Sequence, residues 1–229
     1  MFKKYPQFTF AFAIVFFAEI IAVKGNLTEV RFVTKPLITI SLMLFLHFTI
    51  KLKSRFNNKV LAGLFFSLLG DIFLMFTHAD QIYFMLGLGA FLVAHLFYIS
   101  AFYIDNTNKI EVQQRYVLPI FMVFGFFCIA YYYLLRSHLG TMNIPVLVYS
   151  FVITMMGITA ALRYGKTDSK SFTWILIGAI FFIISDAVLA YNKFVARLEI
   201  GDLLVMSTYM LAQFLITMGT VERKFIKKN

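Results

Sequence analysis

Eight stretches of apolar residues fill most of this chain and constrain its fold more than any other feature. A helix needs about 20 such residues to cross roughly 30 Å of hydrocarbon. The stretches near this length are 8–23, 33–50, 60–77, 82–104, 115–135, 144–163, 171–190 and 202–222. We expect an all-α, polytopic membrane bundle of eight transmembrane helices. Because the connections are short and are not rich in Pro, Gly or Ser, residues 1–229 should form a single transmembrane domain.

The composition and the charge pattern support this assignment. Hydrophobic residues make up 61% of the chain and charged residues only 14%, which excludes an ordinary soluble domain. The net charge of +10 does not indicate a nucleic-acid partner, because the basic residues are dispersed among the connections. The end expected to carry both termini holds 15 of the 21 Lys and Arg residues, and basic residues are enriched on the cytoplasmic side of membrane proteins. We therefore expect cytoplasmic N- and C-termini. The membrane is expected to be a bacterial inner membrane. The opposite end holds Lys24, Arg31, Lys35, Arg136, Lys193 and Arg197.

One aspartate motif occurs twice. Residues 63–75 read GLFFSLLGDIFLM and residues 178–190 read GAIFFIISDAVLA, which places Asp71 and Asp186 at equivalent positions. The segments PLITIS at 36–41 and PVLVYS at 145–150 are also related. Four helices separate the copies in each pair, so the pattern suggests a parallel four-plus-four internal repeat.

Ionisable residues inside membrane helices point to a functional site, because each costs about 2.5–3.5 kcal/mol to insert. Asp71, Asp186 and Glu19 are expected in the non-cytoplasmic half of the bundle. A purely structural role stays open for the two aspartates, and Glu19 can simply pair with Lys35 to join the first two helices. His95 is expected to lie deeper than the aspartates.

Helical spacing shows which residues share a face with each aspartate. Small residues flank both of them, so the two aspartate faces can approach each other. These faces comprise Ser67, Gly70, Asp71 and Leu74 in one helix, and Gly178, Phe182, Ser185 and Leu189, beside Asp186, in the other. Polar side chains also share one face of the fourth span, at His95 and Tyr98, and one face of the eighth span, at Tyr209 and Gln213. His95 and Gln213 can also serve only as hydrogen-bonding residues between helices.

Several common chemistries lack sequence support. The chain contains no His-Glu-x-x-His motif, no Cys/His cluster, no Gly-rich phosphate loop and no Gly-x-Ser-x-Gly elbow. Cys128, the single cysteine, lies in an apolar run and is interpreted as a packing residue. We expect no metal and no cofactor.

Motifs along most of the chain resemble the YhhN-type, lysoplasmalogenase-like membrane proteins. The resemblance rests on KPL at 35–37, SLLGDIFLM at 67–75, GLGAFLVAHLFY at 87–98, PVLVYS at 145–150, SDAVLA at 185–190 and TYMLAQ at 208–213. It implies an eight-helix hydrolase whose substrate is a lysoplasmalogen, a lysophospholipid with a vinyl ether bond. Cleavage of this bond would release a fatty aldehyde and a glycerophospho-base. Its partners would be this substrate and the membrane lipids, while the sequence leaves the head group and the oligomeric state open.

The resemblance also implies a site. The family's acidic residues correspond to Asp71 and Asp186, expected as catalytic, with substrate-binding neighbours expected at Lys35, His95, Tyr149, Ser185, Tyr209 and Gln213. Hydrolysis of a vinyl ether begins with protonation of its β-carbon, and water then captures the resulting oxocarbenium ion. Such a reaction needs an acid that keeps its proton near neutral pH and a negative charge nearby. One aspartate is expected to donate the proton, and the other to stabilise the cation and orient water.

Two other classes of function remain open from the sequence. Repeats and intramembrane carboxylates also occur in transporters and lipid flippases, which need two compartments to be assayed. A non-catalytic lipid-binding or scaffold protein is the third class, and it would tolerate the loss of both aspartates.

Overall fold

The computed structural model describes residues 4–50, 54–106 and 114–224 and contains eight long helices in those ranges. All eight are long and apolar enough to cross a membrane, which makes the chain an integral, multi-pass membrane protein. The helices are α1 (Pro6–Lys24), α2 (Thr28–Thr49), α3 (Arg55–Met75), α4 (Gln81–Asn106), α5 (Gln114–Leu135), α6 (Asn143–Ala161), α7 (Ser169–Phe194) and α8 (Gly201–Val221). Two short 3₁₀ turns, η1 (Arg136–His138) and η2 (Gly140–Met142), connect α5 to α6.

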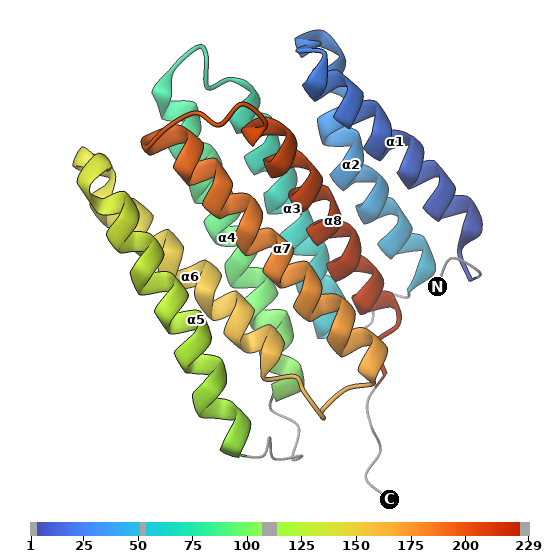
Figure 1. Cartoon of the computed structure of the whole chain (residues 1–229). Helices are drawn as coiled ribbons and strands as arrows, with labels where there is room; N and C mark the ends of the chain where they lie inside the picture. Colours follow the sequence, from blue (N-terminus) through green and yellow to red (C-terminus); the bar gives the residue numbers. More distant parts are fainter. Residues whose placement is uncertain (1–3, 51–53, 107–113, 225–229) are drawn as a thin grey trace, which may run out of the picture.

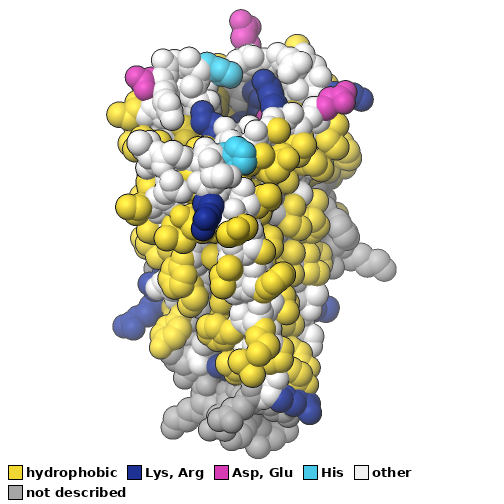
Figure 2. Space-filling model, turned by 60° about the vertical axis from the view of Figure 1, so that its left-hand side comes forward, with side chains coloured by type: hydrophobic (Ala, Val, Ile, Leu, Met, Phe, Trp, Pro, Cys, Tyr) yellow, Lys and Arg dark blue, Asp and Glu magenta, His cyan; other side chains and the backbone are white. Residues whose placement is uncertain are grey.

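The helices run alternately up and down, so both termini lie at the same end of the bundle (Figure 1). The ion pair between Lys4 and Glu222, 3.1 Å long, joins the two terminal segments. Hydrophobic side chains cover the middle of the face shown in Figure 2, and charged side chains gather towards its ends. The predicted helix count is confirmed, while the side of the membrane that each end faces stays a prediction.

The predicted boundaries differ most where a helix continues beyond its apolar stretch. Helices α2 and α3 begin five residues earlier than the apolar stretches starting at 33 and 60, and α7 continues to Phe194. An apolar stretch marks only the part of a helix that lies in the hydrocarbon core of the membrane. The helix itself continues into the polar interface, because its backbone hydrogen bonds do not depend on apolar side chains.

Glycines allow two helix pairs to pack closely. A Cβ atom at Gly70 of α3 would lie 2.6 Å from the Phe91 ring of α4, and one at Gly178 of α7 would lie 3.0 Å from the Ala212 carbonyl oxygen of α8. The small-residue faces beside the two aspartates therefore pack against α4 and α8. They do not bring the two aspartate motifs together as the sequence suggested.

A buried ionic cluster joins three elements at the end that carries the termini. Asp105 of α4 accepts hydrogen bonds from Arg163 Nε at 2.8 Å and from Arg223 Nη2 at 2.5 Å. Arg163 also donates to Ser171 Oγ of α7 at 2.9 Å. Burial lowers the pKa of the Arg163 guanidinium, and the Asp105 carboxylate opposes this shift. Both arginines belong to the 15 basic residues of the topology pattern, and no sequence motif indicated Asp105.

Replacing Asp105 with Asn should destabilise the protein strongly, because two guanidinium groups would lose a buried carboxylate. We expect the free energy of unfolding in detergent to fall by about 3–5 kcal/mol. As a control, Lys4→Gln removes a partner of the exposed terminal pair and should leave the stability within experimental error. Equal stabilities of Asp105→Asn and the wild type would show that the cluster does not hold the helices together.

Candidate active site

Asp186 lies in a small polar cluster between α4, α6 and α7. His95 Nε2 is 3.1 Å from Asp186 Oδ2, and the Tyr149 hydroxyl donates a hydrogen bond to the same oxygen. His95 Nε2 and the Tyr149 oxygen are 2.9 Å apart. His95 therefore lies at the depth of Asp186, which corrects the prediction that it lies deeper. With its proton on Nε2, His95 acts as the second donor to this carboxylate.

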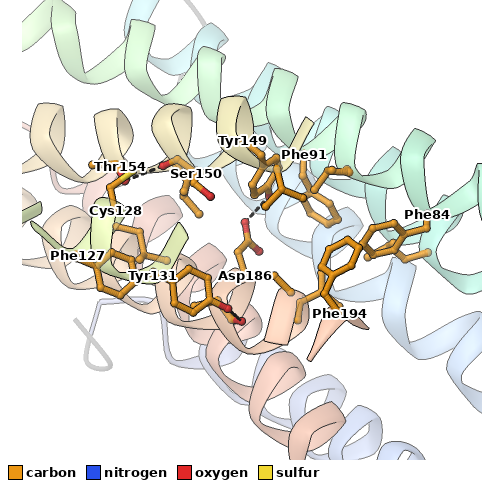
Figure 3. A pocket seen from close by; sticks show the side chains of 18 residues that line it. Phe84, Phe91, Phe127, Cys128, Tyr131, Tyr149, Ser150, Thr154, Asp186 and Phe194 are labelled. Carbon is orange, nitrogen blue, oxygen red and sulfur yellow. Dashed lines mark hydrogen bonds between the residues drawn. The ribbon is translucent and has the colours of Figure 1, made fainter. Parts of the chain in front are cut away.

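The Asp186 cavity, a narrow space of about 40 Å³, borders this cluster (Figure 3). Its walls are mostly apolar: Leu74, Phe84, Leu88, Phe91, Phe127, Cys128, Tyr131, Val146, Tyr149, Ser150, Ile153, Thr154, Ile183, Asp186, Ala187, Leu189, Ala190 and Phe194. The side chain of Asp186 is 11% exposed, so its carboxylate reaches this space. An acid at the edge of an apolar cavity can meet an apolar substrate directly.

Asp71 lies in a second polar cluster, formed by α2, α3 and α8. The Tyr209 hydroxyl donates to Asp71 Oδ2 at 2.6 Å, and Thr39 donates to the same atom at 3.1 Å. Lys35 Nζ is 3.7 Å from Asp71 Oδ1. Only 1% of Asp71 is exposed, so this carboxylate is an internal counter-ion for Lys35.

An aromatic layer lies between the two clusters. Phe182 contacts the rings of His95 and Tyr209, with centroid distances of 4.7 and 5.5 Å. Among the described residues, no hydrogen bond joins the carboxylates of Asp71 and Asp186. Each aspartate therefore has its own set of partners, and a direct role for Asp71 in catalysis stays a prediction.

A wider cavity opens at the end of the bundle opposite the termini. This mouth cavity has a volume of about 360 Å³ and is lined by Arg31, Lys35, Leu74, Thr77, His78, Phe84, Leu189, Asn192, Lys193, Arg197, Asp202, Val205 and Met206. Leu74, Phe84 and Leu189 line both this cavity and the Asp186 cavity. A polar space and an apolar space therefore meet across three shared side chains.

An apolar groove between α4 and α6 adjoins the Asp186 cavity on its other side. This lateral groove has a volume of about 270 Å³ and shares Leu88 and Tyr149 with the Asp186 cavity. Its remaining walls are Met85, Gly89, Leu92, Met142, Ile144, Pro145 and Val148. Leu88 and Tyr149 therefore form the wall between the groove and the Asp186 cavity.

The other predicted site residues have structural partners. Ser185 donates to the Val205 carbonyl oxygen at 2.9 Å and so joins α7 to α8. Gln213 Oε1 accepts from the Tyr98 hydroxyl at 2.7 Å, outside both cavities. Glu19 pairs with Arg31 at 3.3 Å, whereas Lys35 pairs with Asp71, which corrects the expected pairing of Glu19 with Lys35.

Sequence reasoning missed one wall of the Asp186 cavity. Phe127, Cys128 and Tyr131 of α5 contribute to it, and Tyr131 donates a hydrogen bond to the Ala187 carbonyl oxygen beside Asp186. An aromatic residue near a helix end is also typical of an interfacial belt, so its type alone did not indicate the cavity. The spacing of these residues, which puts them on one face of α5, was the available signal. Within the described ranges, no group of three His, Cys, Asp or Glu side chains is placed to hold a metal ion.

Comparisons with known proteins agree with these motifs. The sequence profile of the YhhN family matches residues 30–220. The chain belongs to this family. It is 35% identical to human lysoplasmalogenase TMEM86A over 173 residues, which are 73% of this chain and 67% of that protein. Rat lysoplasmalogenase TMEM86B is 32% identical over 71% of this chain and 61% of its own length. A lysoplasmalogenase of Mycobacterium bovis is 33% identical over 59% of this chain and 50% of its own length. No solved structure gives a significant match.

The two aspartates should differ in their effect on stability. Asp71→Asn leaves the Lys35 cation buried without a counter-charge, which should lower the free energy of unfolding by about 3–5 kcal/mol. The double variant Lys35→Met/Asp71→Asn removes both charges and should regain most of the loss. Asp186→Asn should be milder, since the partners of this carboxylate are uncharged when His95 is neutral. Thermal unfolding in detergent measures all three, and failure of the double variant to recover stability would contradict the proposed pairing.

Proposed function

We propose that this protein is a lysoplasmalogenase, a membrane hydrolase that cleaves the vinyl ether bond of lysoplasmalogens. The observation that carries the proposal is the position of Asp186, which borders an apolar cavity directly beneath a basic, polar mouth. A lysophospholipid has the same two-part character, with a polar head group on a single apolar chain. The names of the relatives support the same reaction.

The cavities suggest how such a substrate binds. The head group occupies the mouth cavity, and the vinyl ether bond lies beside Asp186. A volume of about 40 Å³ holds only the first part of an alkenyl chain. The rest of the chain extends through the lateral groove between α4 and α6, where Leu88 and Tyr149 form the shared wall.

Asp186 is the proton donor in the proposed mechanism. Its carboxyl proton moves to the β-carbon of the vinyl ether, which leaves an oxocarbenium ion facing the new carboxylate. Water adds to this cation, and Asp186 takes the proton that the water loses. The resulting hemiacetal collapses to an aldehyde as its hydroxyl proton passes to the departing glycerol oxygen, so one water molecule is consumed in total.

The neighbours of Asp186 stabilise the charge that develops on it. The Tyr149 hydroxyl and His95 Nε2–H both donate to Oδ2, which leaves Oδ1 for the substrate. Asp71 has an indirect role: its charge balances Lys35 at the floor of the mouth and holds the Tyr209 ring against Phe91 and Phe182. The two aspartates therefore act together, but only Asp186 touches the reacting atoms.

We also propose that the chain contains the four-plus-four repeat, because the two clusters are built alike. Asp71 of α3 is bound by Thr39 of α2 and Tyr209 of α8. Asp186 of α7 is bound by Tyr149 of α6 and His95 of α4. In each half, the aspartate is contacted by the preceding helix and by the last helix of the other half. The comparisons give no support to transport, since the relatives named above are lysoplasmalogenases.

Replacing Asp186 with Asn should lower the rate of aldehyde release about 10²–10⁴-fold, because the proton donor is lost. Purified protein in detergent is incubated with a lysoplasmalogen, and the aldehyde is measured by mass spectrometry. The matched control, Asp80→Asn, removes an exposed carboxylate outside the three cavities and should retain turnover. Wild-type protein that releases no aldehyde would refute the proposed function. Full activity of a folded Asp186→Asn variant would refute only the mechanism.

Cys128 offers a test of where the chain binds, because its thiol lies on the wall of the Asp186 cavity. A lysophospholipid with a saturated ether in place of the vinyl ether should slow alkylation of Cys128 by N-ethylmaleimide. In the control Cys128→Ser/Phe126→Cys, the thiol is on the same helix at a position that is 76% exposed and outside the cavity, and it should not be protected. Equal protection at both positions would show that the lipid does not enter this cavity. Mass spectrometry of the labelled protein measures the rates.

A further inference from the structure

The mouth cavity is lined by more cationic than anionic side chains. Four cationic side chains line it, Arg31, Lys35, Lys193 and Arg197, against one carboxylate, Asp202. His78 also faces it. Charges of one sign around a concave surface raise the local concentration of the opposite ion. The proposed reaction places the head group here but does not itself assign residues that recognise it.

Three of the four cations already have counter-charges. Arg31 pairs with Glu19 at 3.3 Å, Lys35 with Asp71 at 3.7 Å and Arg197 with Asp202 at 3.1 Å. Lys193 has no carboxylate within ion-pair distance among the described residues. It is therefore the cation that leaves the cavity with an excess positive charge.

Lys193 lies at the junction of the two cavities. Its Nζ atom is 4.9 Å from the centroid of Phe84, which lines both the mouth cavity and the Asp186 cavity. A cation over an aromatic face is held in place while it keeps its hydrogen-bond donors. Lys193 follows Asp186 by seven residues on α7, which is about 10 Å along the helix. This spacing suits a substrate in which a glycerol unit separates the anionic group from the reacting bond.

Arg197 lies in the turn between α7 and α8, and Asn192 stabilises this turn. Asn192 Oδ1 accepts a hydrogen bond from the Leu198 backbone N–H at 3.2 Å. The Asn192 amide packs on Gly201, where an added Cβ would lie 2.0 Å from Nδ2. The pair of Arg197 with Asp202 is exposed, and a guanidinium has five donors, so Arg197 can bind a second anion at little energetic penalty.

We propose that Lys193 and Arg197 bind the phosphodiester of the substrate and give the enzyme a preference for phosphorylated vinyl ethers. The proposal rests on the proposed function and names the group by which that site selects its substrate. Arg and Lys are suited to a phosphodiester because their bonds to it are charge-assisted. Glycerol vinyl ethers that lack phosphate fit the same apolar spaces but leave Lys193 without its anion.

The experiment compares two substrates with the same alkenyl chain, an alkenyl-glycerophosphoethanolamine and an alkenyl-glycerol, in a nonionic detergent. The wild type should have a KM for the phosphorylated substrate about tenfold or more below that for the alkenyl-glycerol. In Lys193→Gln/Arg197→Gln, the KM for the phosphorylated substrate should rise by about the same factor. The kcat values and the kinetics with alkenyl-glycerol should stay unchanged, which also shows that the variant is folded.

The matched control is Lys24→Gln/Arg136→Gln, which removes the same charge from the same end of the bundle outside the mouth cavity. It should leave both KM values as in the wild type. Equal KM values for the two substrates in the wild type would overturn the inference. A control variant that raises the KM as much as the cavity variant would also overturn it, because it would reveal only a general surface charge effect. Absence of turnover with either substrate would instead refute the proposed function.

Discussion

The low-dielectric interior of the bundle requires each buried charge to have a partner, and the rest of the structure follows from how these pairs are made. An unpaired ion in such surroundings is penalised by several kcal/mol. Glu19 is therefore matched by Arg31, Lys35 by Asp71, and Asp105 by two arginines. Each pair joins different helices or a helix to a loop, so the need to neutralise charge also fixes how the helices pack.

Asp186 is arranged differently. Its partners are a phenol and an imidazole, and its side chain reaches a cavity. Asp71, by contrast, is enclosed and faces the Lys35 cation. Two aspartates that are equivalent in sequence thus have different environments: Asp71 is a buried counter-ion, whereas Asp186 reaches a cavity, as the proposed proton donor must.

The sequence was sufficient for the features that depend on local composition. Apolar stretches of membrane length predicted eight helices, and the duplicated motif selected both intramembrane aspartates. The partners depend on helix packing, which the pattern within one helix does not reveal. Asp105 and Arg163, for example, are 58 residues apart. Arg31 and Lys35 lie one helical turn apart on α2, so the partner of Glu19 could be chosen only by knowing how α1 and α2 cross. Tyr131 was missed because an aromatic residue near a helix end is equally typical of an interfacial belt.

In the proposed reaction, the junction of the two cavities explains why the acid lies so close to one end of the bundle. Deeper in the bundle, an acid would be far from water and from any group able to receive a charged head group. Nearer the surface, water would surround the carboxyl group and separate it from the apolar space that holds the chain. Beneath Leu74, Phe84 and Leu189, Asp186 is screened by apolar side chains while the mouth cavity begins on their other side. This depth satisfies both requirements, because a lysophospholipid carries its reacting bond where its polar and apolar parts meet.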